Sequence, residues 1–202
     1  MSVNLQKGQK VDLTKGHAGL KTVRVGLGWD AAEPAKAAGL FGGLLGGKRQ
    51  KEIDCDASVI LCDANGKSTK NDIVYFGNLR HSSGSVIHMG DNLTGDGDGD
   101  DEQILVDLST MPHQFEKMVF VVNIYDARGR NQHFGMIKNA FIRLLNAETN
   151  EELCKYSLSE NYDQMTAMIF GEVYRHNGEW KFSAIGQATA DPGLKEVFSR
   201  YV

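Results

Sequence analysis

Alternating apolar and polar residues run through most of the chain, whereas helical spacing is rare. In residues 21–30 (KTVRVGLGWD), Val23, Val25 and Leu27 fall on one face of an extended strand. Other segments rich in β-branched and aromatic residues also predict strands. They are residues 57–62, 72–78, 84–90, 103–108, 117–126, 139–147, 152–158, 167–175 and 180–186. Many strands with short connections predict one all-β domain, built as a sandwich or a barrel.

Two Asn-Gly dipeptides mark predicted hairpins. Asn65-Gly66 and Asn177-Gly178 each lie between two predicted strands. Asn and Gly both tolerate the positive φ that the central positions of a type I′ turn require. Each dipeptide therefore predicts a tight hairpin.

Residues 191–202 (DPGLKEVFSRYV) depart from the strand pattern. Leu194, Val197 and Phe198 recur at helical spacing. Asp191 is suited to cap the N-terminus of a helix, and Pro192 is suited to its first position, where no N–H is needed. We expect a short C-terminal helix that docks on the strands.

The composition indicates an intracellular protein with reduced thiols. A chain of 202 residues can bury about 70% of its unfolded surface, and no apolar run approaches the roughly 20 residues that span a bilayer. The N-terminus lacks the features of a signal peptide. Cys55, Cys62 and Cys154 form no CxxC pair, which favours buried free thiols. The net charge of -4 argues against nucleic acid as a partner. We expect a cytoplasmic location.

Residues 90–104 (GDNLTGDGDGDDEQI) concentrate the acidity of the chain. Their six acidic residues are Asp91, Asp96, Asp98, Asp100, Asp101 and Glu102, and without them the net charge of -4 would be +2. The glycines allow the backbone to fold the carboxylates toward one another. Two carboxylates about 5 Å apart repel by about 3 kcal/mol at an effective dielectric constant of about 20. A folded loop of this kind therefore predicts a bound cation.

The donor types select the cation. Oxygen ligands without a His or Cys pattern suit Ca²⁺ or Mg²⁺, and a flexible glycine-rich loop favours Ca²⁺, which accepts irregular coordination. The loop is not an EF-hand: counting from Asp96, the sixth position is Asp101 instead of glycine and the twelfth is Asp107 instead of glutamate. A solvated acidic face is the simpler alternative.

Three further aspartates are candidate ligands. Strand periodicity places Asp54 and Asp56 on one face at the start of a predicted strand, which pairs their carboxylates. Asp30 ends the preceding predicted strand and would approach them if residues 31–53 close as an insertion. For Asp30, the alternative interpretation is an ordinary turn residue.

Residues 31–53 are small and rich in glycine, and they are interpreted as an insertion between strands. Their GGLLGGKR segment resembles a phosphate-binding loop, but Arg49 stands where a hydroxyl must bind Mg²⁺. A flexible loop is the main interpretation. A membrane or partner contact is the alternative, through the apolar residues Leu40, Phe41, Leu44 and Leu45.

Several motifs together resemble the TerD family of bacterial tellurium-resistance and general-stress proteins. They are GWD (28–30), DCDAS (54–58), GDNLTGDGDGDDEQI (90–104), NQHFG (131–135), NEEL (150–153) and YRHNGEWKFSAIG (174–186). The resemblance covers nearly the whole chain outside the insertion. It implies a β-sandwich of two mainly antiparallel sheets with a short C-terminal helix, and a role in resistance to tellurite and other stresses.

The same resemblance implies two Ca²⁺ ions, bound through the DxD strand and the GDN…GDDE loop. The implied ligands are Asp30, Asp54, Asp56, Asp91, Asn92, Asp98, Asp100, Asp101 and Glu102, with Asn78 as an amide-oxygen ligand. No catalytic activity is established for that family. The expected partners are other tellurium-resistance and stress proteins, at the inner membrane surface in one alternative. Two further alternatives are a metal-dependent phosphoesterase and a Ca²⁺-dependent membrane-binding module.

Overall fold

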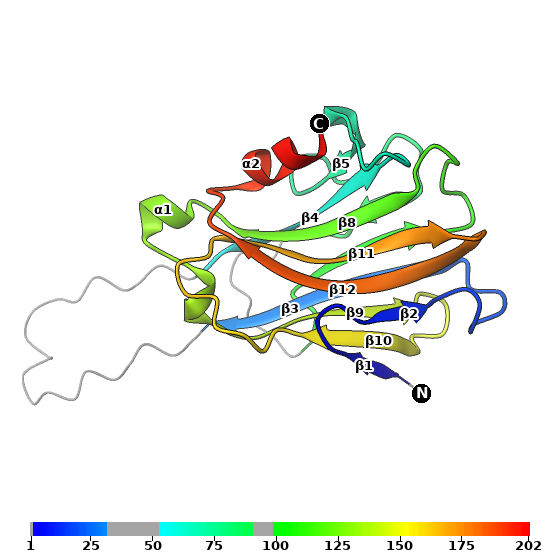
Figure 1. Cartoon of the computed structure of the whole chain (residues 1–202), viewed down its shortest axis with the longest axis horizontal. Coiled ribbons are helices and arrows are strands. Elements are labelled where there is room, and N and C mark those ends of the chain that lie inside the picture. Colours follow the sequence, from blue (N-terminus) through cyan, green and yellow to red (C-terminus); the bar gives the residue numbers. More distant parts are fainter. Residues whose placement is uncertain (1, 32–52, 91–98) are drawn as a thin grey trace, which may run out of the picture.

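The computed structural model describes residues 2–31, 53–90 and 99–202, and its strands form two six-stranded sheets (Figure 1). One core fills the space between the sheets, with Val25 and Leu27 from one sheet and Val59 and Phe120 from the other at most 1% exposed. The predicted β-sandwich is confirmed.

The first sheet has the order β1-β10-β9-β3-β7-β6. Its strands are β1 (Val3–Leu5), β10 (Glu152–Ser157), β9 (Ile137–Asn146), β3 (Thr22–Ala31), β7 (Glu102–Asp107) and β6 (Val86–His88). The β1–β10 pair is parallel and the other pairs are antiparallel. β3 and β7 are therefore direct neighbours, which brings the end of the acidic loop to the middle of the sheet.

The second sheet has the order β2-β12-β11-β8-β4-β5, with all neighbours antiparallel. Its strands are β2 (Lys10–Asp12), β12 (Glu179–Thr189), β11 (Ala167–His176), β8 (Lys117–Ile124), β4 (Cys55–Cys62) and β5 (Ile73–Val74). β4 is buried along its whole length, because the core covers one face and other elements cover the second. This burial on both faces explains why its second half, residues 59–62, is apolar without interruption.

Short helices lie at the margins of the sandwich. They are α1 (Ala127–Arg130), α2 (Leu194–Phe198), η1 (Lys70–Asp72), η2 (Phe134–Met136) and η3 (Ser199–Tyr201). Val197 and Phe198 of α2 pack on Ile60 and Val121, on the outer face of the second sheet. The prediction of a short C-terminal helix that docks on the strands is confirmed. The helix covers the outer face of the second sheet over β4 and β8.

The start of that helix was predicted wrongly. α2 begins at Leu194 with Gly193 as N-cap, not at Asp191 and Pro192. The carbonyl of Asp191 accepts a hydrogen bond from Thr166 Oγ1 at 2.6 Å, and its carboxylate pairs with Arg200. These contacts hold Asp191 at the end of the sheet, outside the helix.

The two Asn-Gly dipeptides behave differently. Asn177 and Gly178 have φ of 53° and 78° and join β11 directly to β12, as predicted. At the other dipeptide, Gly66 has a positive φ of 74°, while Asn65 is not among the residues with positive φ. Asp63 accepts hydrogen bonds from the backbone of this turn, and residues 63–72 separate β4 from β5. A tight hairpin at this position was therefore a wrong prediction.

Two other expectations need qualification. The strand predicted over 72–78 is limited to β5, because Tyr75 and Asn78 bond to each other across a turn. Most of the predicted insertion, residues 32–52 with its four apolar side chains, lies outside the described residues.

Candidate functional site

Asp100 is held in a buried ion pair on the outer face of the first sheet. Arg143 Nε donates to Asp100 Oδ1 at 2.6 Å, and Gln103 Nε2 donates to Oδ2 at 3.2 Å. The carboxylate lies against Gly26 of β3, where an added Cβ would come within 2.2 Å of it. Gly26 therefore leaves the space that Asp100 occupies, and Asp100 raises the pKa of Arg143 above its usual value through this hydrogen bond.

Asp101 fixes the end of the acidic loop to the neighbouring strand. Its backbone N–H donates to the Leu27 carbonyl at 2.8 Å, and Trp29 N–H donates to Asp101 Oδ2 at 2.7 Å. A hydrogen bond from a backbone N–H to an ionised carboxylate is stronger than one between neutral groups. This pair of bonds holds the Asp101 side chain at the end of the sandwich.

Glu102 crosses from the first sheet to the second. Its Oε2 accepts the Ala57 N–H of β4 at 2.6 Å and lies 3.3 Å from His88 Nε2. His88 Nε2 is also 3.2 Å from the Ala57 carbonyl, and the Glu102 and His88 side chains are at most 1% exposed. β5 pairs with β4 at Val59 and Ile60, so Ala57 lies beyond that pairing. Glu102 and His88 thus satisfy backbone groups of β4 there.

Asp54 and Asp56 flank Cys55 at the start of β4, as the DxD spacing predicts. Asp56 is 5% exposed, and its Oδ2 accepts a hydrogen bond from Asn123 Nδ2 at 3.2 Å. Asp54 is 9% exposed, with Arg130 Nη1 3.4 Å from its Oδ2. Both carboxylates are therefore largely removed from water.

Burial and nearby acidic residues both act on the Cys55 thiol. Burial raises the pKa of the Cys55 thiol well above its usual value, and nearby negative charges raise it further. Those charges belong, in decreasing order of effect, to Asp56, Glu102, Asp54 and Asp101. Glu102 of β7 bonds the N–H of Ala57, the residue after Asp56. The end of the acidic loop therefore lies beside the segment that holds Asp54 and Asp56.

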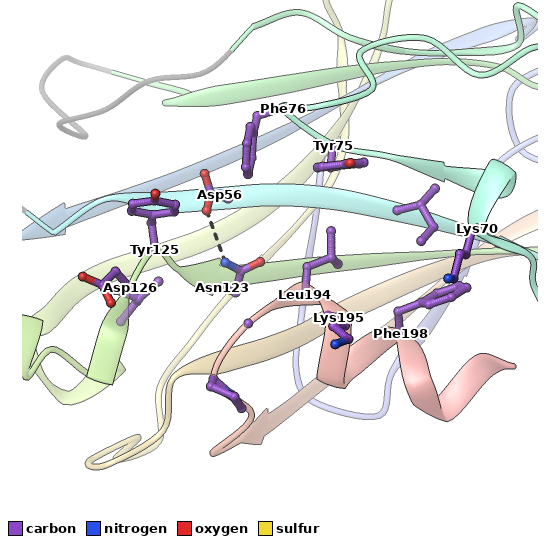
Figure 2. Close-up of a pocket in the computed structure, with 14 residues that line it drawn as sticks. Asp56, Lys70, Tyr75, Phe76, Asn123, Tyr125, Asp126, Leu194, Lys195 and Phe198 are labelled. Atoms are coloured by element: carbon purple, nitrogen blue, oxygen red, sulfur yellow. Dashed lines mark hydrogen bonds between the residues drawn. The ribbon is translucent and has the colours of Figure 1, made fainter. Parts of the chain in front are cut away.

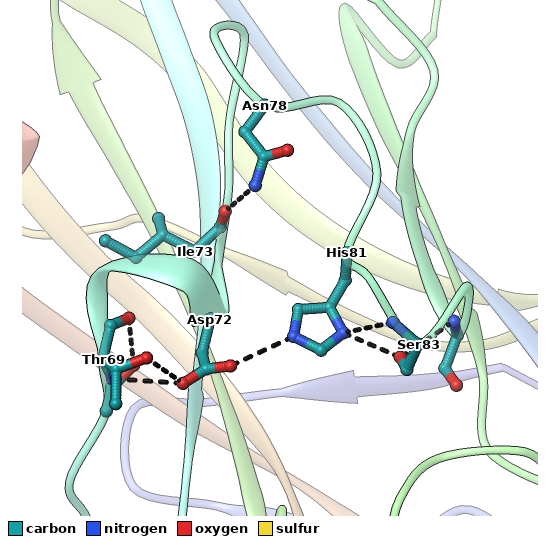
Figure 3. Close-up of polar contacts among 8 residues, drawn as sticks. Thr69, Asp72, Ile73, Asn78, His81 and Ser83 are labelled. Carbon is teal, nitrogen blue, oxygen red and sulfur yellow. Dashed lines mark hydrogen bonds and ion pairs between the residues drawn. The ribbon is translucent and has the colours of Figure 1, made fainter.

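The other predicted ligands lie apart from this group or outside the described residues. Asp30 is exposed and accepts a hydrogen bond from Asn139 Nδ2 at 2.7 Å. Asn78 lies in the turn after β5 and donates to the Ile73 carbonyl at 2.7 Å (Figure 3). Asp91, Asn92 and Asp98 lie outside the described residues. Within the described part of the chain, no three His, Cys, Asp or Glu side chains are placed to hold a metal ion.

A second polar cluster has the side-chain order of a Ser-His-Asp triad (Figure 3). Ser83 Oγ lies 2.7 Å from His81 Nδ1, and His81 Nε2 lies 3.2 Å from Asp72 Oδ1. The Ser83 N–H also donates to Nδ1, which places the ring proton on Nε2, toward Asp72. His81 is 3% exposed and packs edge-on against Phe115. These contacts fasten the loop before β6 to η1, and we assign them a structural role.

The thiols are protected from reaction. All three cysteines are buried and free, as predicted. Burial raises the pKa of Cys62 to about 11 and that of Cys154 to about 12. Since the thiolate is the reactive form, neither side chain is a ready nucleophile at neutral pH.

The TerD domain model matches residues 1–201. The chain belongs to the TerD family. Stress response protein SCP2 of Bacillus subtilis (strain 168) is 53% identical over 203 residues, which cover 100% of both chains. Tellurium resistance protein TerD of Serratia marcescens is 45% identical over 202 residues, covering 100% of this chain and 97% of that protein. The family predicted from the motifs is thus confirmed.

A solved structure supports the same fold. The crystal structure of a homologue of the telluride resistance protein TerD from Streptomyces coelicolor A3(2) superposes with a TM-score of 0.60 at 20% identity. The match covers 86% of this chain and 92% of that one. In the described ranges, no helix of this TerD-family chain is long and apolar enough to span a bilayer.

Sequence reasoning missed three residues that shape the site. His88 and Arg143 are the bases that contact Glu102 and Asp100, and nothing in their local sequence marks them. Gly26 did carry a signal. A glycine inside a strand often marks a close approach by another group, and here that group is the Asp100 side chain.

Proposed function

We propose that this TerD-family protein is a non-catalytic, cytoplasmic calcium-binding protein of the stress response, and that it acts through Ca²⁺-dependent folding or assembly. One observation carries the proposal. Glu102 of β7 bonds the β4 backbone at Ala57, directly after Asp56, so the end of the acidic loop lies beside the Asp54–Asp56 segment. Bringing like charges together is costly unless a cation lies among them.

The donor chemistry fits a hard cation. Asp54, Asp56 and Asp101 offer carboxylate oxygens on ordered backbone, and Ca²⁺ takes six to eight such ligands. Because Asp100 and Glu102 already bond Arg143 and the β4 backbone, we assign them mainly to structure. In our proposal, Asp91, Asn92 and Asp98 supply further oxygens for two ions.

Calcium would act on the junction of the two sheets. Neutralising carboxylates of β4 and of the loop before β7 removes repulsion across that junction, and it fixes the end of the sandwich in one arrangement. Such a surface can then serve assembly with other stress proteins. The printed names of the relatives, stress response and tellurium resistance, agree with a role of this kind.

Calorimetric titration of chelator-treated protein with CaCl₂ tests the proposal. We expect about two bound ions per chain, and stabilisation of about 2.7 kcal/mol for each ion at a free Ca²⁺ concentration of 100 times its Kd. Asp56→Asn should weaken binding at least about tenfold, since one carboxylate charge is lost. Asp163→Asn is the control, because Asp163 has a side chain that is 58% exposed and pairs with His133. Absence of heat and of any rise in melting temperature would refute the proposal.

A further inference from the structure

A hollow of about 520 Å³ lies on the outer face of the second sheet, between α2, the turn after β5 and the end of β8 (Figure 2). This is the size range of small-molecule sites, about 300–1,000 Å³. Its walls are mainly apolar and include Ile73, Phe76, Ile124, Leu194 and Phe198. The hollow is therefore suited to a compact apolar body.

Two aromatic rings stand at the mouth of the hollow. Phe76 is 46% exposed and Tyr125 is 47% exposed, which is high for rings of this size. In Figure 2 they flank the Asp56 carboxylate. The Arg130 guanidinium already lies 4.9 Å from the centroid of the Tyr125 ring. The Phe76 face beside the Asp56 carboxylate is therefore the one that suits an organic cation.

The floor of the hollow holds a buried acceptor with no partner among the described residues. Asn123 is 6% exposed, and its Nδ2 donates to Asp56 Oδ2 at 3.2 Å. Its Oδ1 has no hydrogen bond in the described part of the chain, and Figure 2 shows it turned away from Asp56, beside Leu194. A buried acceptor is costly to leave unsatisfied. A ligand N–H that enters past Leu194 would satisfy it.

The charges around the hollow are separated. Asp56 and Asp126 line it near the end of β8, whereas Lys70 lies at the other side beside Phe198 and Lys195 projects from α2 (Figure 2). A cationic N–H donor therefore fits the acidic side, and an anionic group fits the side with the lysines.

We propose that this hollow binds a small organic molecule with a primary ammonium group on an aromatic or similarly flat apolar body. The ammonium group donates to Asn123 Oδ1 beside Asp56, and the body lies between Phe76 and Leu194. An anionic group at the opposite end strengthens binding through Lys70 and Lys195. This inference goes beyond the calcium proposal, although both sites involve Asp56.

Titration of ¹⁵N-labelled full-length protein with three related probes tests the inference. They are 4-(aminomethyl)benzoate, benzylamine and 4-methylbenzoate, with Kd taken from amide chemical shifts. We expect the first to bind most tightly, and 4-methylbenzoate, which lacks the ammonium group, to bind at least about tenfold more weakly. The side-chain amide signals of Asn123 should shift with both amines. Equal affinity for all three probes would overturn the inference.

Two variants locate the binding. Leu194→Trp fills the hollow from α2 and should abolish binding of 4-(aminomethyl)benzoate, while Phe76→Ala should weaken it severalfold. Leu79→Ala is the matched control, because Leu79 is 44% exposed and does not line the hollow. Unchanged binding by a folded Leu194→Trp protein would show that the amine attaches elsewhere, and the inference would fail.

The same titration with chelator and with CaCl₂ separates this site from the calcium site. If the protein binds the amine but shows no Ca²⁺ binding, the result would support the amine site in the hollow and reject only the calcium proposal. If the protein binds Ca²⁺ but does not bind the amine selectively, with chelator or with CaCl₂, the result would support the calcium proposal and reject the amine site.

Discussion

The acidic residues at the start of β7 and those at the start of β4 are close in space but differ in their partners. Asp100 meets the charged Arg143 side chain at 2.6 Å, and its own side chain is 1% exposed. Asp56 meets the neutral amide of Asn123 at 3.2 Å. The bond from Arg143 brings a positive charge to Asp100, whereas the bond from Asn123 brings none to Asp56.

This difference divides one acidic region into two kinds of position. Carboxylates with a fixed protein cation or backbone donor stabilise the sandwich, and replacing them should lower the free energy of unfolding in the absence of any metal. Asp56, which we propose as a calcium ligand, should matter most when a cation is present. The experiments below test this division.

Glu102→Ala should have the largest effect. It removes the acceptor of the Ala57 N–H and the neighbour of His88 at a site that is at most 1% exposed. Breaking a buried pair of this kind costs about 3–5 kcal/mol, to be measured by urea unfolding in chelator. Glu102→Gln keeps a carbonyl acceptor and should lose less. If Asp56→Ala destabilises the metal-free protein as strongly as Glu102→Ala, the division into two kinds of position is wrong.

Gly26→Ala should have an intermediate effect. Its Cβ would lie 2.2 Å from the Asp100 carboxylate, so Asp100 must leave Arg143 or the strand must shift. Overpacking of this kind costs about 1–3 kcal/mol. Gly16→Ala is the matched control, since the nearest atom to its added Cβ is 3.9 Å away. The double variant Gly26→Ala/Asp100→Ala should lose less than the sum of the two single losses. Strict additivity would mean that the two residues do not interact.

The longer strands could be predicted from the sequence because one face of each sheet is buried. In β3, inward Val23 and Val25 alternate with Arg24, and that alternation defines an extended strand. β1 and β2 could not be predicted, since a strand such as Val3–Leu5 is too short to show a period. The hairpin predicted at Asn65 was wrong for another reason. The Asp63 side chain accepts hydrogen bonds from the turn backbone, and this arrangement replaces a two-residue hairpin turn.

The sequence indicated which acidic residues would lie near one another in the candidate site, but not which side chains they would contact. The DxD spacing placed Asp54 and Asp56 together because strand period is a local property. The contact of Glu102 with Ala57 depends on how two sheets face each other, and no local pattern encodes that arrangement. For the same reason the sequence could not show that Arg143 bonds Asp100, one of the predicted ligands.

Lys7→Ala should have the smallest effect on stability. It gives the value expected for an exposed ion pair, with which the buried carboxylates can be compared. Lys7 Nζ lies 2.8 Å from Glu160 Oε2, but the two side chains are 46% and 51% exposed. Exposed pairs contribute little, because water and salt screen them and ordering the side chains costs entropy. We expect a change in melting temperature within experimental error at neutral pH.

The pH dependence of the Lys7 pair provides an internal check. The hydrogen bond to Glu160 raises the pKa of Lys7. The contribution of this ion pair to the free energy of unfolding is therefore complete below the ordinary lysine pKa. It disappears as pH rises through the raised pKa of Lys7. Unfolding curves of wild-type and Lys7→Ala protein at neutral and alkaline pH, with and without added NaCl, measure this contribution. A loss at neutral pH as large as that of Gly26→Ala would show that charge pairing stabilises this protein regardless of burial, and the contrast between β7 and β4 would lose its physical basis.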